Sequence, residues 1–256
     1  MCFDVTSALR TMIKYAKHRG DDPAEIAVME KELEAWRKSF QTHYHVSGFS
    51  HPDLLVFTNE KPKQSQAYRW GLIPSWVKDN KTAHTLSNQT INARAETIYE
   101  KPSFRNAAQR NHCLIYLDAF YEHHHAHGKT YPFHIAMKNG SPLSVAGLWD
   151  EWVDKETGEV IHSVTIITTT ANATMSKIHN NPKLAEPRMP VILPKDKQDE
   201  WLTCNDKKQA EQLLIPFPDK LLEYHTVRRL KGKEAVGDCP EAEEAYVYEE
   251  LETGFG

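Results

Sequence analysis

The second residue of the chain is a cysteine, within the opening stretch MCFDVTS. Removal of the initiator methionine would leave Cys2 with a free α-amine and a thiol on adjacent carbons. The pKa is ordinarily about 7.7–8.0 for an α-amine and about 8.5 for a thiol, so both groups are partly nucleophilic near neutral pH. Position alone leaves two interpretations of Cys2 open: a reactive aminothiol, or an accident of where translation begins.

Two stretches in the first half of the chain combine aromatic, basic and amide side chains. The first, YRWGLIPSW, holds Trp70 on a predicted turn, where the ring could stack on a nucleic-acid base or belong to the core. The second, INARAET, places Asn92, Arg94 and Glu96 at every second position before a predicted helix. A helix cap would account for Glu96 and a surface ion pair for Arg94.

Two further stretches place titratable groups beside predicted strands. In LDAFYEHHH, Glu122 ends an apolar strand, where burial would raise the pKa of the carboxyl toward neutrality. A glutamate in that state can act as a general acid and base, although a solvent-facing carboxylate at a strand end is the alternative. In KIHNNPKLAEPRMPVIL, His179 follows a helix and Arg188 precedes a buried strand.

The histidine-rich run HHHAH could suggest a metal site. Neighbouring residues on a strand point to opposite faces, so at most two of these histidines could bind one ion, and a complete site would need ligands from elsewhere. We expect a polar turn here, with no metal and no cofactor. The sequence contains none of the common nucleotide-binding loops or serine- and zinc-hydrolase motifs.

Composition describes an ordinary globular protein. Of the 256 residues 40% are hydrophobic and 26% charged, and no run approaches the ~18 apolar residues of a membrane span. The four cysteines are far apart and form no C-x-x-C pair, which favours a reducing cytoplasm over a disulfide framework or a zinc site.

Charge is distributed unevenly along the chain. The net charge is −4, but residues 238–256 hold seven acidic residues and no lysine or arginine, so residues 1–237 carry 31 basic against 28 acidic residues. We expect one mildly basic domain over residues 1–237 and an acidic, solvated tail over residues 238–256. A tail that covers a basic groove until a ligand displaces it is the alternative.

Hydrophobic periodicity predicts the elements that would position these residues. Helices are expected at residues 7–19, 22–41 and 96–111, in a short segment through Met175 and His179, and in PKDKQDEWLT and DKKQAEQLL. Strands are expected in YHVSGF, DLLVFTN, HCLIYLDAFYEH, TYPFHIAM, LSVAGLWDEW, HSVTIITTT, MPVIL and LLEYHTVRR. This order predicts an α+β fold, a single domain with a mostly antiparallel, barrel-like sheet flanked by helices.

Taken in order, these stretches resemble the SRAP family, the SOS response-associated peptidases that sense abasic sites in DNA. The resemblance is carried by Cys2, RWGLIPSW, INARAET, AFYEH, AGLWDEW, TIITTTAN, His179 and RMPVIL, from Cys2 to about Leu193. It implies that the mature N-terminal cysteine captures the ring-opened aldehyde of an abasic site in single-stranded DNA. The amine would form an imine and the thiolate would then close a thiazolidine ring, so that the lesion is shielded in a covalent adduct.

The same resemblance implies a role for each candidate. Glu122 would move protons during condensation, Asn92 would hold the amine and sugar in register, and His179 would assist ring opening by contacting the sugar O4′. Arg94 and Arg188 match arginines that hold backbone phosphates, and Trp70 matches a stacking residue beside the lesion. The resemblance also implies lyase-like and self-cleaving peptidase activity. We assume a monomer that is cytoplasmic and is associated with the nucleoid when bound to DNA.

The chain departs from the family pattern at three places. Phe3 and Asp4 follow Cys2 where Cys-Gly-Arg is usual, so a negative charge replaces an expected phosphate contact. His123 follows Glu122 where tryptophan is usual, and an inserted stretch separates His179 from Arg188. Two other functions stay open: a hydrolase whose N-terminal cysteine attacks amides, and a noncovalent single-strand-binding module with an inert Cys2.

Overall fold

The computed structural model describes residues 3–7, 23–24, 26–27 and 42–251. The helices predicted at residues 7–19 and 22–41 therefore fall almost entirely outside the described residues. None of the helices in the described part has the length and apolar character that a membrane crossing requires.

Five strands close into a barrel: β3 (Asp53–Thr58), β4 (Gln66–Trp70), β6 (His112–Leu117), β9 (Leu143–Val153) and β10 (Val160–Thr170). They pair in the order β10–β4–β3–β6–β9, and β9 pairs again with β10. The β10–β4 pairing is parallel and the others are antiparallel, so the barrel is mixed.

Both faces of the barrel wall are buried along β3 and β6, which explains why these strands are nearly continuous apolar runs. Along β3, Leu54 and Val56 belong to one core cluster, while Leu55 and Phe57 belong to a second. The second cluster also contains side chains of three helices, α4 (Arg105–Arg110), α6 (Lys195–Thr203) and α7 (Lys207–Leu213). These helices therefore cover the face that carries Leu55 and Phe57.

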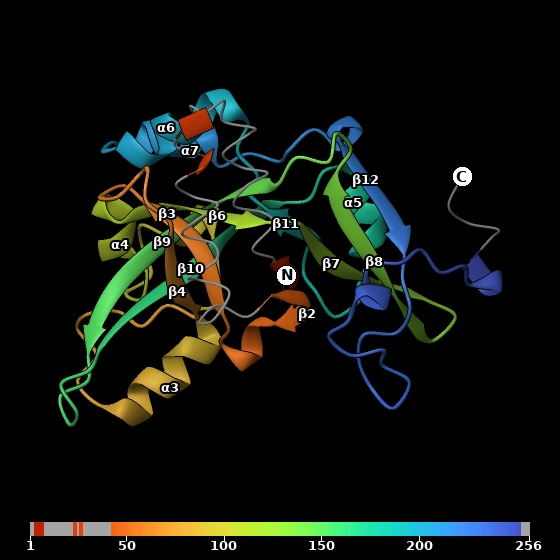
Figure 1. The fold of residues 1–256 in the computed structure, drawn as a ribbon, viewed down its shortest axis with the longest axis horizontal. Helices are drawn as coiled ribbons and strands as arrows, with labels where there is room; N and C mark the ends of the chain where they lie inside the picture. The colour runs from red at the N-terminus through yellow and green to blue at the C-terminus, as the bar shows by residue number, and fades with distance from the viewer. Residues whose placement is uncertain (1–2, 8–22, 25, 28–41, 252–256) are drawn as a thin grey trace.

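A second sheet is wholly antiparallel and lies beside the barrel. Its order is β12 (Leu222–Thr226), β8 (Lys129–Met137), β7 (Ala119–Ala126), β1 (Asp4–Ser7) and β2 (His43–Ser47). In Figure 1 the barrel lies on the left beneath α6 and α7, whereas β7, β8, β12 and α5 (Ala173–Ile178) lie on the right.

Two short strands pair with β10 in addition to the strands of the barrel. β5 (Asn92–Arg94) runs parallel to it and β11 (Arg188–Pro190) antiparallel, both near its end at Thr170. The remaining elements are α3 (Asn80–Gln89) and the 3-10 turns Gly48–Ser50, Ala95–Thr97, Asp219–Leu221, Pro240–Ala242 and Glu249–Leu251.

The α+β class and the barrel-like sheet are confirmed, but three element predictions need correction. HCLIYLDAFYEH is two strands rather than one, because the chain leaves the barrel after β6 and enters the second sheet as β7. The predicted helix over residues 96–111 is a 3-10 turn followed by the short α4. The structure also contains α3 and β4, neither of which was predicted as an element.

The acidic C-terminal segment packs on the domain instead of extending into solvent as a tail. Asp238 accepts hydrogen bonds from the backbone N–H groups of Tyr44 and His45, at 2.7 and 3.1 Å. Ala242 is fully buried, and Tyr248 packs in the core while its hydroxyl donates to the carbonyl of Val227. The prediction of a separate solvated tail is therefore wrong for residues 238–251.

Candidate active site

A cavity of about 330 Å³ opens where β1, β7 and the segment after α5 meet. Its lining residues come from four parts of the chain that are far apart in sequence. They are Phe3, Asp4, Tyr121, Glu122, His123, His125, Thr130, His179, Asn181, Leu184 and Lys231. Both titratable residues predicted for proton transfer, Glu122 and His179, are among them.

Glu122 belongs to the wall of this cavity because β7 is an interior strand of the second sheet. β1 pairs on one side of it, with Asp4 opposite Tyr121, and β8 pairs on the other, with Phe133 opposite Glu122 itself. Only 4% of Glu122 is exposed. Burial penalises the charged form of a carboxyl, and it raises the pKa of Glu122 to about 7.

His179 is placed by the end of α5. Asn172 caps the start of this helix by accepting from the N–H of Met175, and the buried Met175 and Ile178 anchor it in the core. The His179 N–H donates to the carbonyl of Met175, so the ring sits at the C-terminal end of the helix. Burial lowers the pKa of His179 to about 4.

The two side chains face each other as a neutral pair. His179 Nδ1 lies 2.8 Å from the carbonyl oxygen of Arg188. The backbone N–H of Arg188 also lies 3.3 Å from Nδ1, but the shorter contact is to the carbonyl, which can only accept. It favours the tautomer with the hydrogen on Nδ1 and Nε2 as the acceptor. Nε2 lies 3.7 Å from Glu122 Oε2, which is longer than a hydrogen bond. Burial favours the neutral form of each group, so His179 is neutral near pH 7 and Glu122 keeps its proton below about that pH.

A salt bridge between Asp4 and Lys231 also lies at this cavity. The sequence did not indicate it. Asp4 is 2% exposed and accepts from Lys231 Nζ at 2.7 Å, with His45 Nε2 3.3 Å away. Burial alone would raise the pKa of Asp4, but His45 and Lys231 together outweigh it and lower the pKa. This pair could not be predicted from neighbouring positions in the sequence, because Lys231 lies 227 residues after Asp4.

Arg188 is buried and fully engaged by the protein. Its Nη1 donates to Glu186 at 2.7 Å and its Nη2 to Glu96 at 2.8 Å. The carbonyl and hydroxyl of Thr168 accept from Nη2 and Nε. With 1% of its side chain exposed, Arg188 holds β11 and the 95–97 turn on β10 and has no surface to offer a phosphate. The predicted phosphate contact does not fit this placement.

Trp70 also belongs to the core. Its ring is fully buried, and Nε1 donates to the carbonyl of Ile91 at 2.8 Å. The predicted stacking on a base beside the lesion is therefore excluded in this conformation, and the alternative of a core tryptophan holds. In the same stretch it is Trp76 that is exposed, by 45%.

Asn92 and Arg94 lie on β5, next to the end of β10. Asn92 is half-buried opposite Ile166, and Arg94 is exposed opposite Thr168. Neither is among the described residues that line the cavity. Despite the inserted stretch, Arg188 remains beside His179, because β11 pairs with β10 immediately after the insertion.

Cys2 lies outside the described residues. Of the other cysteines, Cys113 and Cys204 are buried and Cys239 is half-buried. In the described part of the chain, no group of three or more His, Cys, Asp or Glu side chains is arranged to hold a metal ion.

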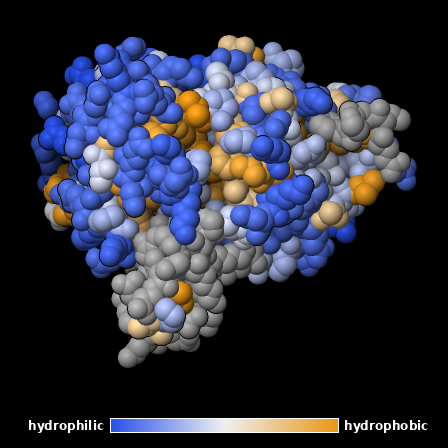
Figure 2. Space-filling view, turned by 90° about the horizontal axis from the view of Figure 1, so that it is seen from above, coloured by the Kyte–Doolittle hydropathy of each residue, from blue (hydrophilic) through white to orange (hydrophobic). Residues whose placement is uncertain are grey.

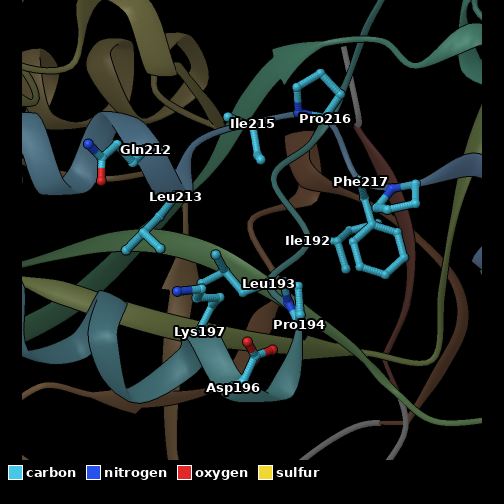
Figure 3. Close-up of a pocket in the computed structure, with 11 residues that line it drawn as sticks. Ile192, Leu193, Pro194, Asp196, Lys197, Gln212, Leu213, Ile215, Pro216 and Phe217 are labelled. Carbon is cyan, nitrogen blue, oxygen red and sulfur yellow. The ribbon is translucent and has the colours of Figure 1, made fainter.

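A second cavity, of about 240 Å³, has a different character. Hydrophobic residues are exposed between hydrophilic areas on the face seen in Figure 2, and Figure 3 shows the apolar side chains of Ile192, Leu193 and Phe217 around this cavity. Asp196 and Lys197 are its titratable residues, and it shares no lining residue with the cavity of Glu122. The Glu122 cavity is therefore the candidate active site.

Comparisons with known proteins identify the family of this chain. The family model described as SOS response associated peptidase (SRAP) matches residues 9–233. The chain is 36% identical over 194 residues to Abasic site processing protein YoaM of Bacillus subtilis, covering 75% of this chain and 80% of that protein. It is 28% identical over 214 residues to Abasic site processing protein HMCES of Xenopus tropicalis, covering 73% and 62% of the two chains.

Solved structures show the same fold. A crystal structure from Bacteroides thetaiotaomicron is similar with a TM-score of 0.80 at 29% identity, covering 96% of this chain and 100% of that one. A second, from Bordetella bronchiseptica, has a TM-score of 0.69 at 27% identity and covers 88% and 99%. The chain belongs to the SOS response associated peptidase (SRAP) family.

Proposed function

We propose that this protein acts on abasic sites in single-stranded DNA and joins them covalently through Cys2 as a thiazolidine. The observation that carries the proposal is the neutral pair of Glu122 and His179 in the wall of a cavity that β1 also lines. The names of the curated relatives, abasic site processing proteins, support the substrate class.

The first strand supports the assignment of Cys2. Phe3 and Asp4 line the cavity, and Asp4 lies opposite Tyr121, the neighbour of Glu122. Cys2 precedes Phe3 in the chain, and a peptide unit joins consecutive Cα atoms over about 3.8 Å. The nucleophile is thus connected directly to the wall that holds the proton donor.

Glu122 has the protonation state that the condensation needs. Attack of the α-amine on the aldehyde gives a carbinolamine, and loss of its hydroxyl as water requires an acid. With a pKa of about 7, Glu122 can donate that proton at neutral pH. The thiolate then adds to the imine carbon, and the proton that the nitrogen takes up restores neutrality. One aldehyde and one aminothiol thereby give one thiazolidine and one water.

His179 would act before condensation, when the sugar ring opens. Donation to O4′ needs a hydrogen on Nε2, whereas the contact of Nδ1 with the Arg188 carbonyl leaves Nε2 as an acceptor. Glu122 is the described acid nearest to Nε2, at 3.7 Å, and catalytic contacts of this length commonly shorten when substrate binds. We therefore assign ring opening to proton relay from Glu122 through His179 to O4′. The C1′–O4′ bond breaks, and the C1′ hydroxyl loses its proton to solvent as the aldehyde forms.

The remaining predicted residues keep more limited roles. Arg94 is exposed at the end of β5 and can contact a phosphate, while Asn92, two residues earlier, is assigned to holding the amine and sugar. Trp70 and Arg188 are not assigned contacts with DNA, because both are buried. We expect the protein to bind single-stranded DNA in preference to duplex DNA, because the sugar of the lesion must enter the cavity.

The test is a heat-stable adduct between the protein, with Met1 removed, and an oligonucleotide carrying one abasic site. Cys2→Ser should abolish the stable adduct, because an oxazolidine is a weaker trap than a thiazolidine. Cys239→Ser is the matched control, since Cys239 is half-buried and does not line the cavity. An adduct equally durable in Cys2→Ser would refute the thiazolidine, and absence of any adduct with abasic DNA would favour a hydrolase or a noncovalent binder.

A further inference from the structure

The segment that follows β12 is rich in basic residues and reaches the cavity through Lys231. Four of the six residues from 228 to 233 are basic: Arg228, Arg229, Lys231 and Lys233. Leu230 is buried in a cluster with Tyr121 and Val227, which fixes the segment on β7. Arg229 Nη1 reaches the carbonyl of Thr130, a cavity-lining residue, at 3.4 Å.

Lys231 is the cation that this segment presents to the cavity. Among the described lining residues it is the only lysine or arginine. Its side chain is 53% exposed, whereas that of Asp4, its partner, is 3% exposed. A ligand entering the cavity therefore meets the ammonium group first, and the carboxylate lies behind it.

The geometry leaves hydrogen-bonding capacity at this ammonium. A lysine ammonium has three N–H donors, and in the described part of the chain its hydrogen bond is to Asp4, at 2.7 Å. The Asp4 carboxylate is in turn held by His45. Asp4 thus fixes the direction of the Lys231 side chain while two donors stay available to an anion.

We infer that Lys231 is a phosphate-binding residue of this site, which holds a nonbridging oxygen of the DNA backbone beside the sugar in the cavity, and that Asp4 is its positioning residue. The inference rests on the proposed function for the identity of the ligand. It also explains why an acidic residue is tolerated at position 4: the positive charge at this edge comes from the C-terminal segment. Arg188 cannot supply it, because Glu96 and Glu186 already bind its guanidinium.

The test measures the salt dependence of binding to an undamaged single-stranded oligonucleotide, so that no covalent chemistry contributes. Each phosphate contact on a single strand contributes about 0.7 to the slope of log affinity against log salt concentration. Lys231→Met should lower the magnitude of the slope by about 0.7. Between 50 and 200 mM salt, the wild-type protein should lose about 2.5-fold more affinity than this variant.

Lys155→Met is the matched control, because it removes the same charge from an exposed residue in the β9–β10 turn, at the end of β10 remote from Thr170. Its slope should equal that of the wild-type protein. An unchanged slope in Lys231→Met, an equal change in Lys155→Met, or a wild-type protein that does not bind the oligonucleotide overturns the inference.

A second pair of variants separates phosphate binding from neutralisation of Asp4 and guards against a folding defect. Lys231→Met leaves the Asp4 carboxylate buried without its cation, whereas the double variant Asp4→Asn/Lys231→Met does not. The double variant should keep the reduced slope. Asp4→Asn alone should keep the wild-type slope, because the amide oxygen of asparagine can still accept from Lys231 and hold its direction. If the double variant regains the wild-type slope, Lys231 only neutralises Asp4 and the inference fails. Because adduct formation is scored separately, failure of the crosslink leaves this test interpretable.

Discussion

Replacement of Glu122 by glutamine should change how the stability of the protein depends on pH. The carboxyl has an ordinary pKa of 4.5 and a pKa of about 7 in the folded protein, because it is buried. Between these values the folded state binds more protons than the unfolded state, so the free energy of unfolding falls as pH rises from about 4.5 to 7. Glutamine has no proton to lose and abolishes this dependence.

The expected magnitude follows from the size of the shift. One pKa unit corresponds to about 1.4 kcal/mol, so a shift from 4.5 to about 7 makes the ionised carboxylate cost about 3 kcal/mol at pH 8. At pH 4 the cost is close to zero. Glu122→Gln should therefore gain about 3 kcal/mol relative to the wild-type protein between pH 4 and pH 8, whatever constant offset the amide itself introduces.

His179 makes the comparison with a variant necessary. Its folded pKa is depressed to about 4, so the unfolded state binds more protons between pH 4 and 6.5, and stability falls as pH falls through that range. The His179 and Glu122 contributions have opposite signs between pH 4.5 and 6.5 and largely cancel in the wild-type protein. Only the difference between wild type and Glu122→Gln isolates the carboxyl.

The measurement is urea denaturation at several pH values from 4 to 8, with Glu159→Gln as the control. Glu159 is exposed in the β9–β10 turn, and its variant should run parallel to the wild-type protein. A difference between wild type and Glu122→Gln that stays constant from pH 4 to 8 would show that folding does not raise the pKa of Glu122, which would then be ionised at neutral pH. The assignment of Glu122 as the proton donor would then be refuted.

Three further outcomes are expected. His179→Ala should slow crosslinking of an ordinary abasic site but leave crosslinking of an acyclic aldehyde analogue nearly unaffected, while Glu122→Gln should slow both reactions by roughly 10²–10⁴-fold. An equal defect of His179→Ala on the analogue would contradict its role in ring opening. Trp70→Phe should lower the free energy of unfolding by about 1–3 kcal/mol, because a buried carbonyl loses its donor, and should leave DNA affinity unchanged; a lower affinity in the folded variant would restore the stacking role. Removal of residues 238–256 should lower the free energy of unfolding, measured by urea denaturation, by at least about 3 kcal/mol, since Tyr248 leaves the core. An unchanged denaturation midpoint would show that this segment does not stabilise the fold.

Local patterns in the sequence were sufficient for most strands but not for their partners. DLLVFTN and HSVTIITTT are strands as predicted, since β-branched and aromatic runs between turn signals have few alternatives. The division of HCLIYLDAFYEH between two sheets was missed, because both halves are equally apolar and only their partners differ. Closure through the parallel β10–β4 pairing likewise depends on contacts remote in sequence.

The candidate site residues show the same limit of local sequence patterns. Glu122 and His179 line one cavity and lie 3.7 Å apart, and the burial of Glu122 at the end of an apolar run could be foreseen. Their catalytic roles stay predictions. The roles of Trp70 and Arg188 in DNA contact did not follow, because a motif gives residue identity and not exposure. Lys231 had no local signal, since its partner lies at the other end of the chain.

The long sequence separations at this site have a consequence for biosynthesis. β1 pairs with residues 119–121, and its Asp4 bonds to Lys231. At a translation rate of about 5–20 residues per second, the strand that begins the chain is made roughly 10–45 s before that lysine. During this interval a nascent chain cannot complete the cavity, so β1 is translated well before the other groups that line the cavity with it.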